Sequence, residues 1–143
     1  MKSWFIYALL SAVCAAFVSI FGKLGLDGVD SSAATTVRAI IMALFLLIVS
    51  VFHGHLTAMP SVFSHPRGLL YIALSGIAGA SSWLFYFMAL QSGQVSQVAP
   101  IDKLSVVFAV IFAILLFGEQ VSLVHGIAIV FIAIGGLLLA IYP

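Results

Sequence analysis

Charged side chains inside long apolar runs are the residues of this sequence best suited to do chemistry. Arg38 lies within one such run, and Asp102 and Lys103 lie just after Pro100 at the start of another. An ionisable group in hydrocarbon costs about 2.5 to 3.5 kcal/mol on insertion scales, so its retention indicates a function. We expect Asp102, Lys103 and Arg38 to form a polar gate or coupling site, with the two basic residues as counter-charges of the carboxylate.

A plainer interpretation stays open for each of these residues. The long side chain of Arg38 could extend to the nearest membrane surface. If Ser96 caps its helix, Pro100 falls in the first turn, where the missing N–H costs little. Asp102 is then an interfacial residue near the positive end of the helix dipole, with Lys103 turned outward.

Small, hydroxyl-bearing and aromatic residues recur at helical spacing near these charges. Such stripes are more often helix-packing surface than ligand site. The hydroxyl of Tyr86 and the indole N–H of Trp83 nevertheless need partners, which favours a pocket. We predict that a small-molecule solute contacts Tyr7, Ser11, Ser82, Trp83, Tyr86 and Ser105.

Catalytic and metal chemistry have little support. The pair His53 and His55 lacks the further ligands of a metal site. No nucleophile, base and orienting group occur at a recognisable spacing, and no Gly-rich phosphate loop is present. We therefore expect no enzymatic activity, no metal and no cofactor.

The composition identifies lipid as the solvent of the folded chain. Of the 143 residues 64% are hydrophobic and only 6% are charged, whereas an ordinary soluble domain carries about 25% charged residues. Too few polar side chains exist to coat a water-facing surface. The net charge of +1 gives no basis for nucleic-acid binding. We expect an integral membrane protein whose environment is the bilayer.

Five apolar runs are long enough to span a bilayer, which takes roughly 20 residues in a helix. Each run must satisfy its backbone hydrogen bonds internally, so only helices fit. The sequence predicts an all-α integral membrane protein, a bundle of five transmembrane helices in a single domain over residues 1–143. The predicted helices cover residues 4–21, 33–52, 69–90, 98–117 and 123–142.

Several residues mark where these helices begin or end. Asp30, Ser31 and Ser32 are good N-cap residues for the second helix. Gly118 is suited to ending the fourth helix, and Glu119 to the first turn of the fifth. Residues 53–68, with two prolines, are expected to form the longest loop.

An odd number of spans places the two termini on opposite sides of the membrane. The N-terminal side carries Lys2 and Arg67, and the other side carries Lys23, with Arg38 and Lys103 near it. This balance gives no orientation under the positive-inside rule. One interpretation is insertion in both orientations, which makes an inverted repeat from two copies. The alternative is a single orientation in which five basic residues balance by chance.

Several motifs carry a resemblance to a known family. They are FVSIFGKLGL at residues 17–26 and, between residues 81 and 122, ALQSG, VAPIDKLS and FGE in that order. With the glycines of the last run, Gly126, Gly135 and Gly136, these motifs resemble the EamA domain of the drug/metabolite transporter superfamily. The resemblance covers essentially the whole chain.

The resemblance implies a carrier in the bacterial inner membrane that moves a small metabolite or amphipathic compound by alternating access. Family members usually have ten spans built from two inverted five-helix halves, and this chain is similar to one half. An antiparallel homodimer is therefore expected. Related small multidrug transporters use an acidic residue in the first helix, which this sequence lacks, so cationic-drug export by that route is in doubt. Asp102 is the carboxylate positioned to respond to protons.

Two alternatives from other classes stay open. The chain could be a non-transporting scaffold or accessory subunit whose polar residues pack against another protein. It could also be a flippase for a lipid-linked substrate, which needs a lateral opening that a sequence does not reveal.

Overall fold

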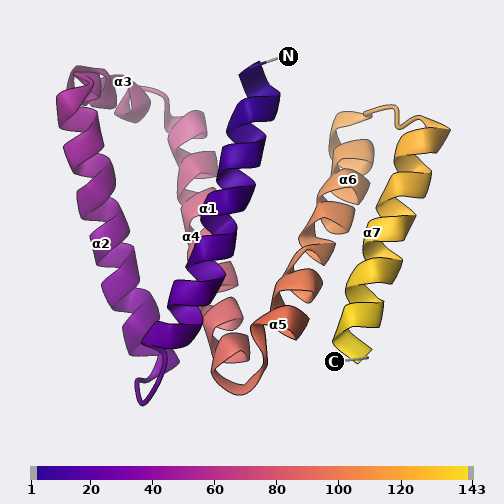
Figure 1. Cartoon of the computed structure of the whole chain (residues 1–143). Coiled ribbons are helices and arrows are strands. Elements are labelled where there is room, and N and C mark those ends of the chain that lie inside the picture. Colours follow the sequence, from indigo (N-terminus) through magenta and orange to yellow (C-terminus); the bar gives the residue numbers. More distant parts are fainter. Residues whose placement is uncertain (1–2, 142–143) are drawn as a thin grey trace. The chain divides into compact units, whose positions relative to one another are not determined.

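The structure is a computed structural model, and it describes residues 3–141. Every regular element in this range is a helix (Figure 1). The elements are, in chain order, α1 (Ser3–Gly25), α2 (Ser31–Phe52), η1 (His55–Ala58), α3 (Met59–Phe63), α4 (Pro66–Ser92), α5 (Val95–Asp102), α6 (Leu104–Phe117) and α7 (Leu123–Ile141).

The prediction of five membrane-spanning helices is confirmed. Within residues 3–141, five helical segments are long and apolar enough to cross a bilayer, with α5 and α6 together forming the fourth, Val95–Phe117. Most spans are longer than predicted, and α4 extends beyond the predicted run at both ends. Residue 142, the predicted end of the last helix, lies outside the described range, and so does Lys2. The single domain over residues 1–143 stays a prediction.

The chain divides into two compact units, which are described separately. One unit holds residues 25–91, with α2, η1, α3 and α4. The other unit holds the chain up to Leu24 together with the chain from Ser92 onward, and thus contains nearly all of α1 with α5, α6 and α7.

In the unit of residues 25–91, α2 begins at Ser31, two residues before the predicted start, and Asp30 is the one of the three candidate residues that caps it. The Asp30 carboxylate accepts a hydrogen bond of 2.8 Å from the backbone N–H of Ala33, which satisfies one free donor of the first helical turn. The chain leaves α2 through Gly54, whose positive φ of 69° suits glycine. The long loop predicted for residues 53–68 instead contains the short helices η1 and α3.

The core of this unit lies at the end of α4 that approaches the start of α2. Leu90 is fully buried on α4, where Tyr86 and Phe87 are buried too. Leu26, in the connection before α2, is also buried. The Gln91 side-chain amide donates a hydrogen bond of 3.1 Å to the Val29 carbonyl. This contact fixes the last turn of α4 beside the entry to α2.

In the other unit, the fourth span is broken at Lys103, between α5 and α6. The helix begins after Gln94, so the predicted cap at Ser96 is wrong, and Pro100 lies in the interior of α5 rather than in its first turn. Proline there lacks the N–H that would bond to the carbonyl four residues earlier, and its ring clashes with that carbonyl. The helix ends at Asp102, two residues after Pro100, and α6 begins at Leu104.

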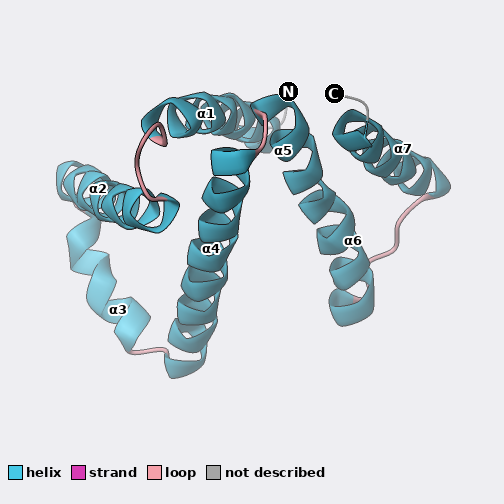
Figure 2. Ribbon diagram, turned by 90° about the horizontal axis from the view of Figure 1, so that it is seen from below, coloured by secondary structure: helices cyan, strands magenta, loops and turns pink. Residues whose placement is uncertain are grey.

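Helix α7 packs closely against this break. Gly136 is buried, and a Cβ atom at that position would lie 3.0 Å from the Pro100 carbonyl oxygen. A glycine is needed because any side chain would meet the backbone of α5. Figures 1 and 2 show α7 returning beside α6 after the connection that follows Gly118.

Gly118 ends α6 with a positive φ of 64°, as the sequence predicts. The placement of Glu119 in the first turn of the last helix is wrong, because α7 begins only at Leu123. Ser122 precedes it, and its hydroxyl accepts a hydrogen bond of 3.4 Å from the His125 N–H. The small hydroxyl side chain thus takes the capping position.

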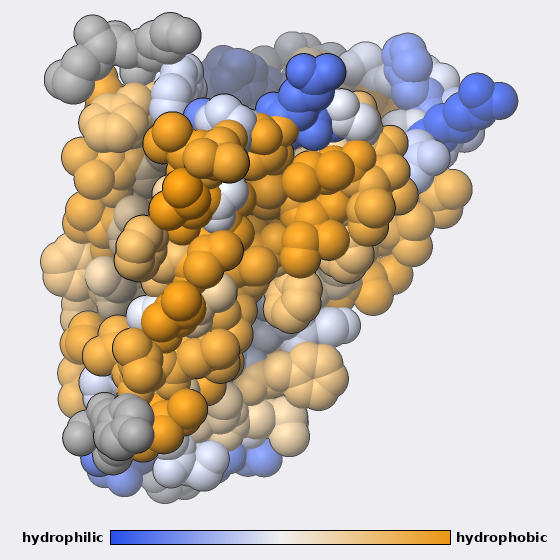
Figure 3. All heavy atoms as spheres, turned by 90° about the vertical axis from the view of Figure 1, so that its right-hand side faces the viewer, coloured by the Kyte–Doolittle hydropathy of each residue, from blue (hydrophilic) through white to orange (hydrophobic). Residues whose placement is uncertain are grey.

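Large hydrophobic side chains lie exposed on all of the long helices. Hydrophobic residues dominate the face shown in Figure 3, and hydrophilic residues gather toward its upper and lower edges. A surface of this kind is compatible with lipid and not with water. The chain is a multi-pass membrane protein.

Candidate functional site

The clearest polar feature inside a span is a contact between Arg38 of α2 and the aromatic rings of α4. The guanidinium carbon Cζ lies over the Trp83 ring, 3.7 Å from its centroid, and 5.3 Å from the centroid of Phe87. Both distances are within the range in which a cation is attracted by the negative face of a ring. We call Arg38, Trp83, Tyr86 and Phe87 the arginine–aromatic cluster.

The aromatic members of this cluster hold one another in place. Trp83 meets Tyr86 edge to face with centroids 5.6 Å apart, and it meets Phe87 at 6.1 Å in a similar geometry. Tyr86 and Phe87 are buried, whereas Trp83 is only partly buried. Residues three and four apart on a helix share a face, so Trp83 with Tyr86 and Phe87 forms one wall of α4.

The cluster lies well inside the span. Arg38 follows the first residue of α2, Ser31, by seven positions, about 10 Å along the axis at 1.5 Å per residue. Trp83 precedes the end of α4 at Ser92 by nine positions, about 13 Å. The guanidinium is thus held at the depth of the rings rather than at the end of the helices.

Arg38 has no acidic partner in the described part of the chain. Between residues 3 and 141, the ion pair present joins Lys103 and Asp102, and no hydrogen bond from the Arg38 side chain is found. The rings therefore supply its main stabilising contact.

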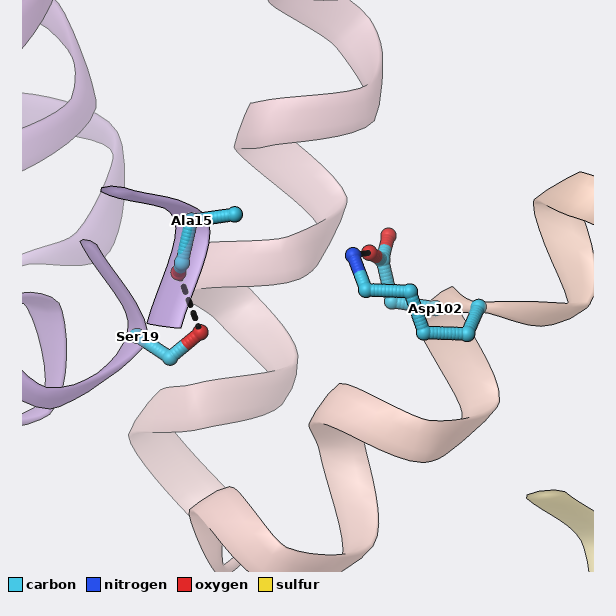
Figure 4. Close-up of polar contacts among 4 residues, drawn as sticks. Ala15, Ser19 and Asp102 are labelled. Atoms are coloured by element: carbon cyan, nitrogen blue, oxygen red, sulfur yellow. Dashed lines mark hydrogen bonds and ion pairs between the residues drawn. The ribbon is translucent and has the colours of Figure 1, made fainter. Parts of the chain in front are cut away.

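Asp102 and Lys103 lie in the other unit, at the break between α5 and α6. Lys103 Nζ lies 3.1 Å from an Asp102 carboxylate oxygen (Figure 4), and the two side chains are 33% (Asp102) and 56% (Lys103) exposed. Adjacent residues on a continuous helix point in different directions. Interrupting the helix at Lys103 lets the two charges meet. Lys103 is thus a counter-charge of Asp102, as expected.

The other predicted solute contacts are spread over both units. Tyr7 and Ser11 are exposed on α1, and Ser105 is exposed on α6. Ser82 is exposed on α4, next to Trp83. The structure brings Trp83, Tyr86 and Arg38 together within one unit. Arg38 as a counter-charge of Asp102 in a shared gate stays a prediction, because the two residues belong to different units.

Three structural residues escaped the sequence interpretation. Phe87 was not among the predicted contacts, although its spacing of four from Trp83 was a usable signal. Lys23 donates a hydrogen bond of 2.8 Å to the Gly93 carbonyl, and Ser19 is buried and donates to the Ala15 carbonyl at 3.2 Å (Figure 4). The contact between Lys23 and Gly93 joins residues seventy positions apart, and no local sequence pattern indicates it.

The histidines at the end of α2 form a local structure. The rings of His53 and His55 stack with centroids 5.9 Å apart, and His53 Nδ1 lies 3.0 Å from the Val49 carbonyl oxygen. Over residues 3–141, no group of three or more His, Cys, Asp or Glu side chains is arranged to hold a metal ion.

Comparison with known proteins places these features in a family. A family model described as the EamA-like transporter family matches residues 2–141. A curated protein of Sinorhizobium sp, named "Uncharacterized transporter in cobO 3'region", is 40% identical over 141 residues, which cover 99% of each chain. No solved structure matches this chain.

The family, the relative and the five apolar spans agree with one another. They describe a membrane transporter, as the sequence motifs predicted. This chain belongs to the EamA-like transporter family.

Proposed function

We propose that this chain carries a small solute across the bacterial inner membrane by alternating access, as an antiparallel homodimer. The solute, a small metabolite or amphipathic compound, binds near the middle of the bilayer between the two copies. Asp102, Lys103 and Arg38 act as the gate or coupling group. The remaining contacts are Tyr7, Ser11, Ser82, Trp83, Tyr86 and Ser105.

The observation that carries this proposal is the exposure of polar side chains on the spans of a single copy. Tyr7 is 71% exposed, and the hydroxyls of Ser11, Ser82 and Ser105 also lie on exposed surface. In a lone copy these groups would face lipid, where an unpartnered polar group raises the free energy. A second copy that covers them turns the same residues into the wall of a wet pathway.

The distribution of charge supports opposed insertion. Five spans put the termini on opposite sides, and the basic residues show no bias between the two faces. A chain without this bias has no strong preferred orientation under the positive-inside rule. Two copies inserted in opposite directions have the symmetry of the inverted repeats from which many transporters are built.

The interruption of the fourth span supports a solute pathway in a different way. In transporters, substrate and ion sites are typically formed by discontinuous helices near the bilayer midplane. The helix is interrupted at Lys103, where the backbone N–H still bonds to the Ala99 carbonyl, and an ion pair lies at the interruption. Charged groups within a span are tolerated where they pair with one another or face a water-filled cavity.

Cross-linking of α1 tests the antiparallel dimer. Cys14 is exposed and lies midway between Ser3 and Gly25, so two opposed copies with facing α1 helices place their Cys14 residues at the same depth. We expect a bismaleimide to link wild-type chains in native membranes into dimers. In a Cys14→Ser background, Ser3→Cys should not link to itself but should link to a co-expressed Leu24→Cys chain.

The same set of variants can contradict the proposal. In a parallel dimer each residue lies at the same depth as its counterpart in the other copy. Ser3→Cys would therefore link to itself as efficiently as Cys14 does. If none of the three combinations is cross-linked, α1 does not lie at the dimer interface and does not line the proposed pathway. Recovery of the chain only with a foreign subunit would favour the accessory-subunit alternative.

A further inference from the structure

We propose that Arg38, held against Trp83 and Phe87, is an anion receptor that binds the acidic group of the solute. The group it recognises is a carboxylate or a phosphate. This inference deepens the proposed function by naming a substrate class. It rests on the proposed function only for the statement that the bound anion is then transported.

The geometry of Arg38 leaves its hydrogen-bonding edge available. The guanidinium is held over the Trp83 ring at 3.7 Å, with Phe87 at 5.3 Å. Its N–H groups radiate from the edge of the planar head, where a carboxylate or phosphate binds through two parallel hydrogen bonds. Within residues 3–141 no acceptor occupies these donors. The rings thus orient the guanidinium without satisfying it.

The charge of the membrane-spanning helices favours the same class of ligand. The five spans contain four basic side chains, Lys23, Arg38, Arg67 and Lys103, against a single acidic one, Asp102. Asp102 is already paired with Lys103 at 3.1 Å. Basic residues lining a pathway attract anions and repel cations. An anion at Arg38 is therefore favoured by local hydrogen bonding and by the excess of basic over acidic residues in the spans.

A cationic solute is the opposite possibility, since the aromatic wall of α4 could bind a cation in place of Arg38. The displaced guanidinium would then have to leave its rings inside the span, and neither α2 nor α4 contains a carboxylate that could receive it. Two positive charges near one wall also repel each other. The contacts in this unit consequently favour an anion, and the cation becomes an outcome of the test.

Tryptophan fluorescence gives a direct test on the full chain. The sequence contains two tryptophans, so Trp4→Phe leaves Trp83 as the reporter. The purified protein in dodecyl maltoside is titrated with sodium benzoate and with inorganic phosphate at constant sodium chloride. We expect a saturable change in Trp83 emission with at least one of these anions, and none with glycerol or tetraethylammonium chloride.

Variants at Arg38 separate specific binding from a general salt effect. Arg38→Lys keeps the charge but loses the planar fork, so the apparent affinity should fall about tenfold or more, which is about 1.4 kcal/mol. Arg38→Gln should abolish the response. The matched control is Arg67→Lys, at an exposed position near the start of α4, which should bind like the parent. Circular dichroism spectra confirm that each variant is folded.

Two results would overturn the inference. A saturable response to tetraethylammonium and none to either anion would assign the wall to cations. An equal apparent affinity of Arg38→Lys and the parent for the anion would show that the guanidinium does not bind it.

A further arm distinguishes a solute from a lipid phosphate. The benzoate titration is repeated in nanodiscs containing phosphatidylglycerol, where we expect the response to persist. If the response disappears there and short-chain phosphatidylglycerol reproduces it in micelles, the receptor binds lipid and the solute assignment is wrong. The cross-linking of Cys14 is independent of these titrations, so failure of the dimer and failure of anion binding are recognised separately.

Discussion

Arg38 lies inside a span, where a cation is unfavourable unless other contacts replace the hydration that it loses. The structure supplies that replacement with the faces of Trp83 and Phe87 instead of a carboxylate. A cation over an aromatic ring is stabilised by about 0.5–1 kcal/mol when exposed and by about 2 kcal/mol or more when desolvated. The contact therefore offsets much of the cost of placing Arg38 in the span while leaving its donors for another partner.

A double-mutant cycle measures this contact. Arg38→Gln, Trp83→Leu and the double variant are unfolded by SDS titration in mixed micelles. We expect a coupling free energy of about 0.5–2 kcal/mol between the two positions. Pairing Arg67→Gln with Trp83→Leu provides the control, which should be additive within about 0.5 kcal/mol. Additivity of the Arg38 pair would contradict an energetic role for the contact.

At this scale the sequence pointed to Trp83 and Tyr86 but did not predict that Arg38 contacts the Trp83 ring. Trp83 and Tyr86 were singled out because each carries a donor that needs a partner, and both are part of the cluster. Arg38 was paired with Asp102 because opposite charge was the available criterion. Its contact with Trp83 depends on which face of α4 meets α2, which the composition of either helix does not determine.

The fourth span has the most informative element-scale feature, because its break and its packing depend on each other. Pro100 lies inside α5 two residues before its end, and Gly136 lets α7 approach the Pro100 carbonyl. Leu104 Cδ2 also lies 3.6 Å from the position of a Cβ at residue 136. The break is thus covered by the last helix rather than left open to lipid.

Alanine substitutions at two adjacent glycines test this packing. Gly136→Ala would place a methyl group 3.0 Å from a backbone oxygen that cannot rotate away, so we expect a loss of about 1–3 kcal/mol in the free energy of unfolding. Gly135→Ala has nothing within 4 Å and should lose no stability. The same SDS titration measures both. Equal stability of the two variants would show that α7 does not approach α5 this closely.

The number of helices was predictable because it depends only on the length of apolar runs. The end of α6 was predicted because Gly118 has one strong preference, whereas three residues could have capped α2, and Asp30 is the one that does. The break at Lys103 was not predicted, because the helix was expected over residues 98–117, with Ser96 as a possible cap and Pro100 in the first turn. The helix begins after Gln94, so Pro100 lies in its interior.

For the whole molecule, two properties that the sequence determines support the opposed dimer. The spans are odd in number, and the few basic residues favour neither face. The dimer itself could not be derived from one chain, since a single copy contains no record of what covers Tyr7 or Ser105. Its support comes from the polar surface that one copy leaves exposed inside the spans.

The most direct measurement of this central claim is the orientation of the chain in living cells. In a Cys14→Ser background, single cysteines are introduced by Asp27→Cys, between α1 and α2, or by Thr57→Cys, between α2 and α4, two loops on opposite sides of the membrane. An impermeant maleimide is applied to intact and to permeabilised cells. Antiparallel insertion predicts that about half of the chains are labelled from outside at each position. Full labelling of one position from outside and none of the other would contradict the antiparallel dimer.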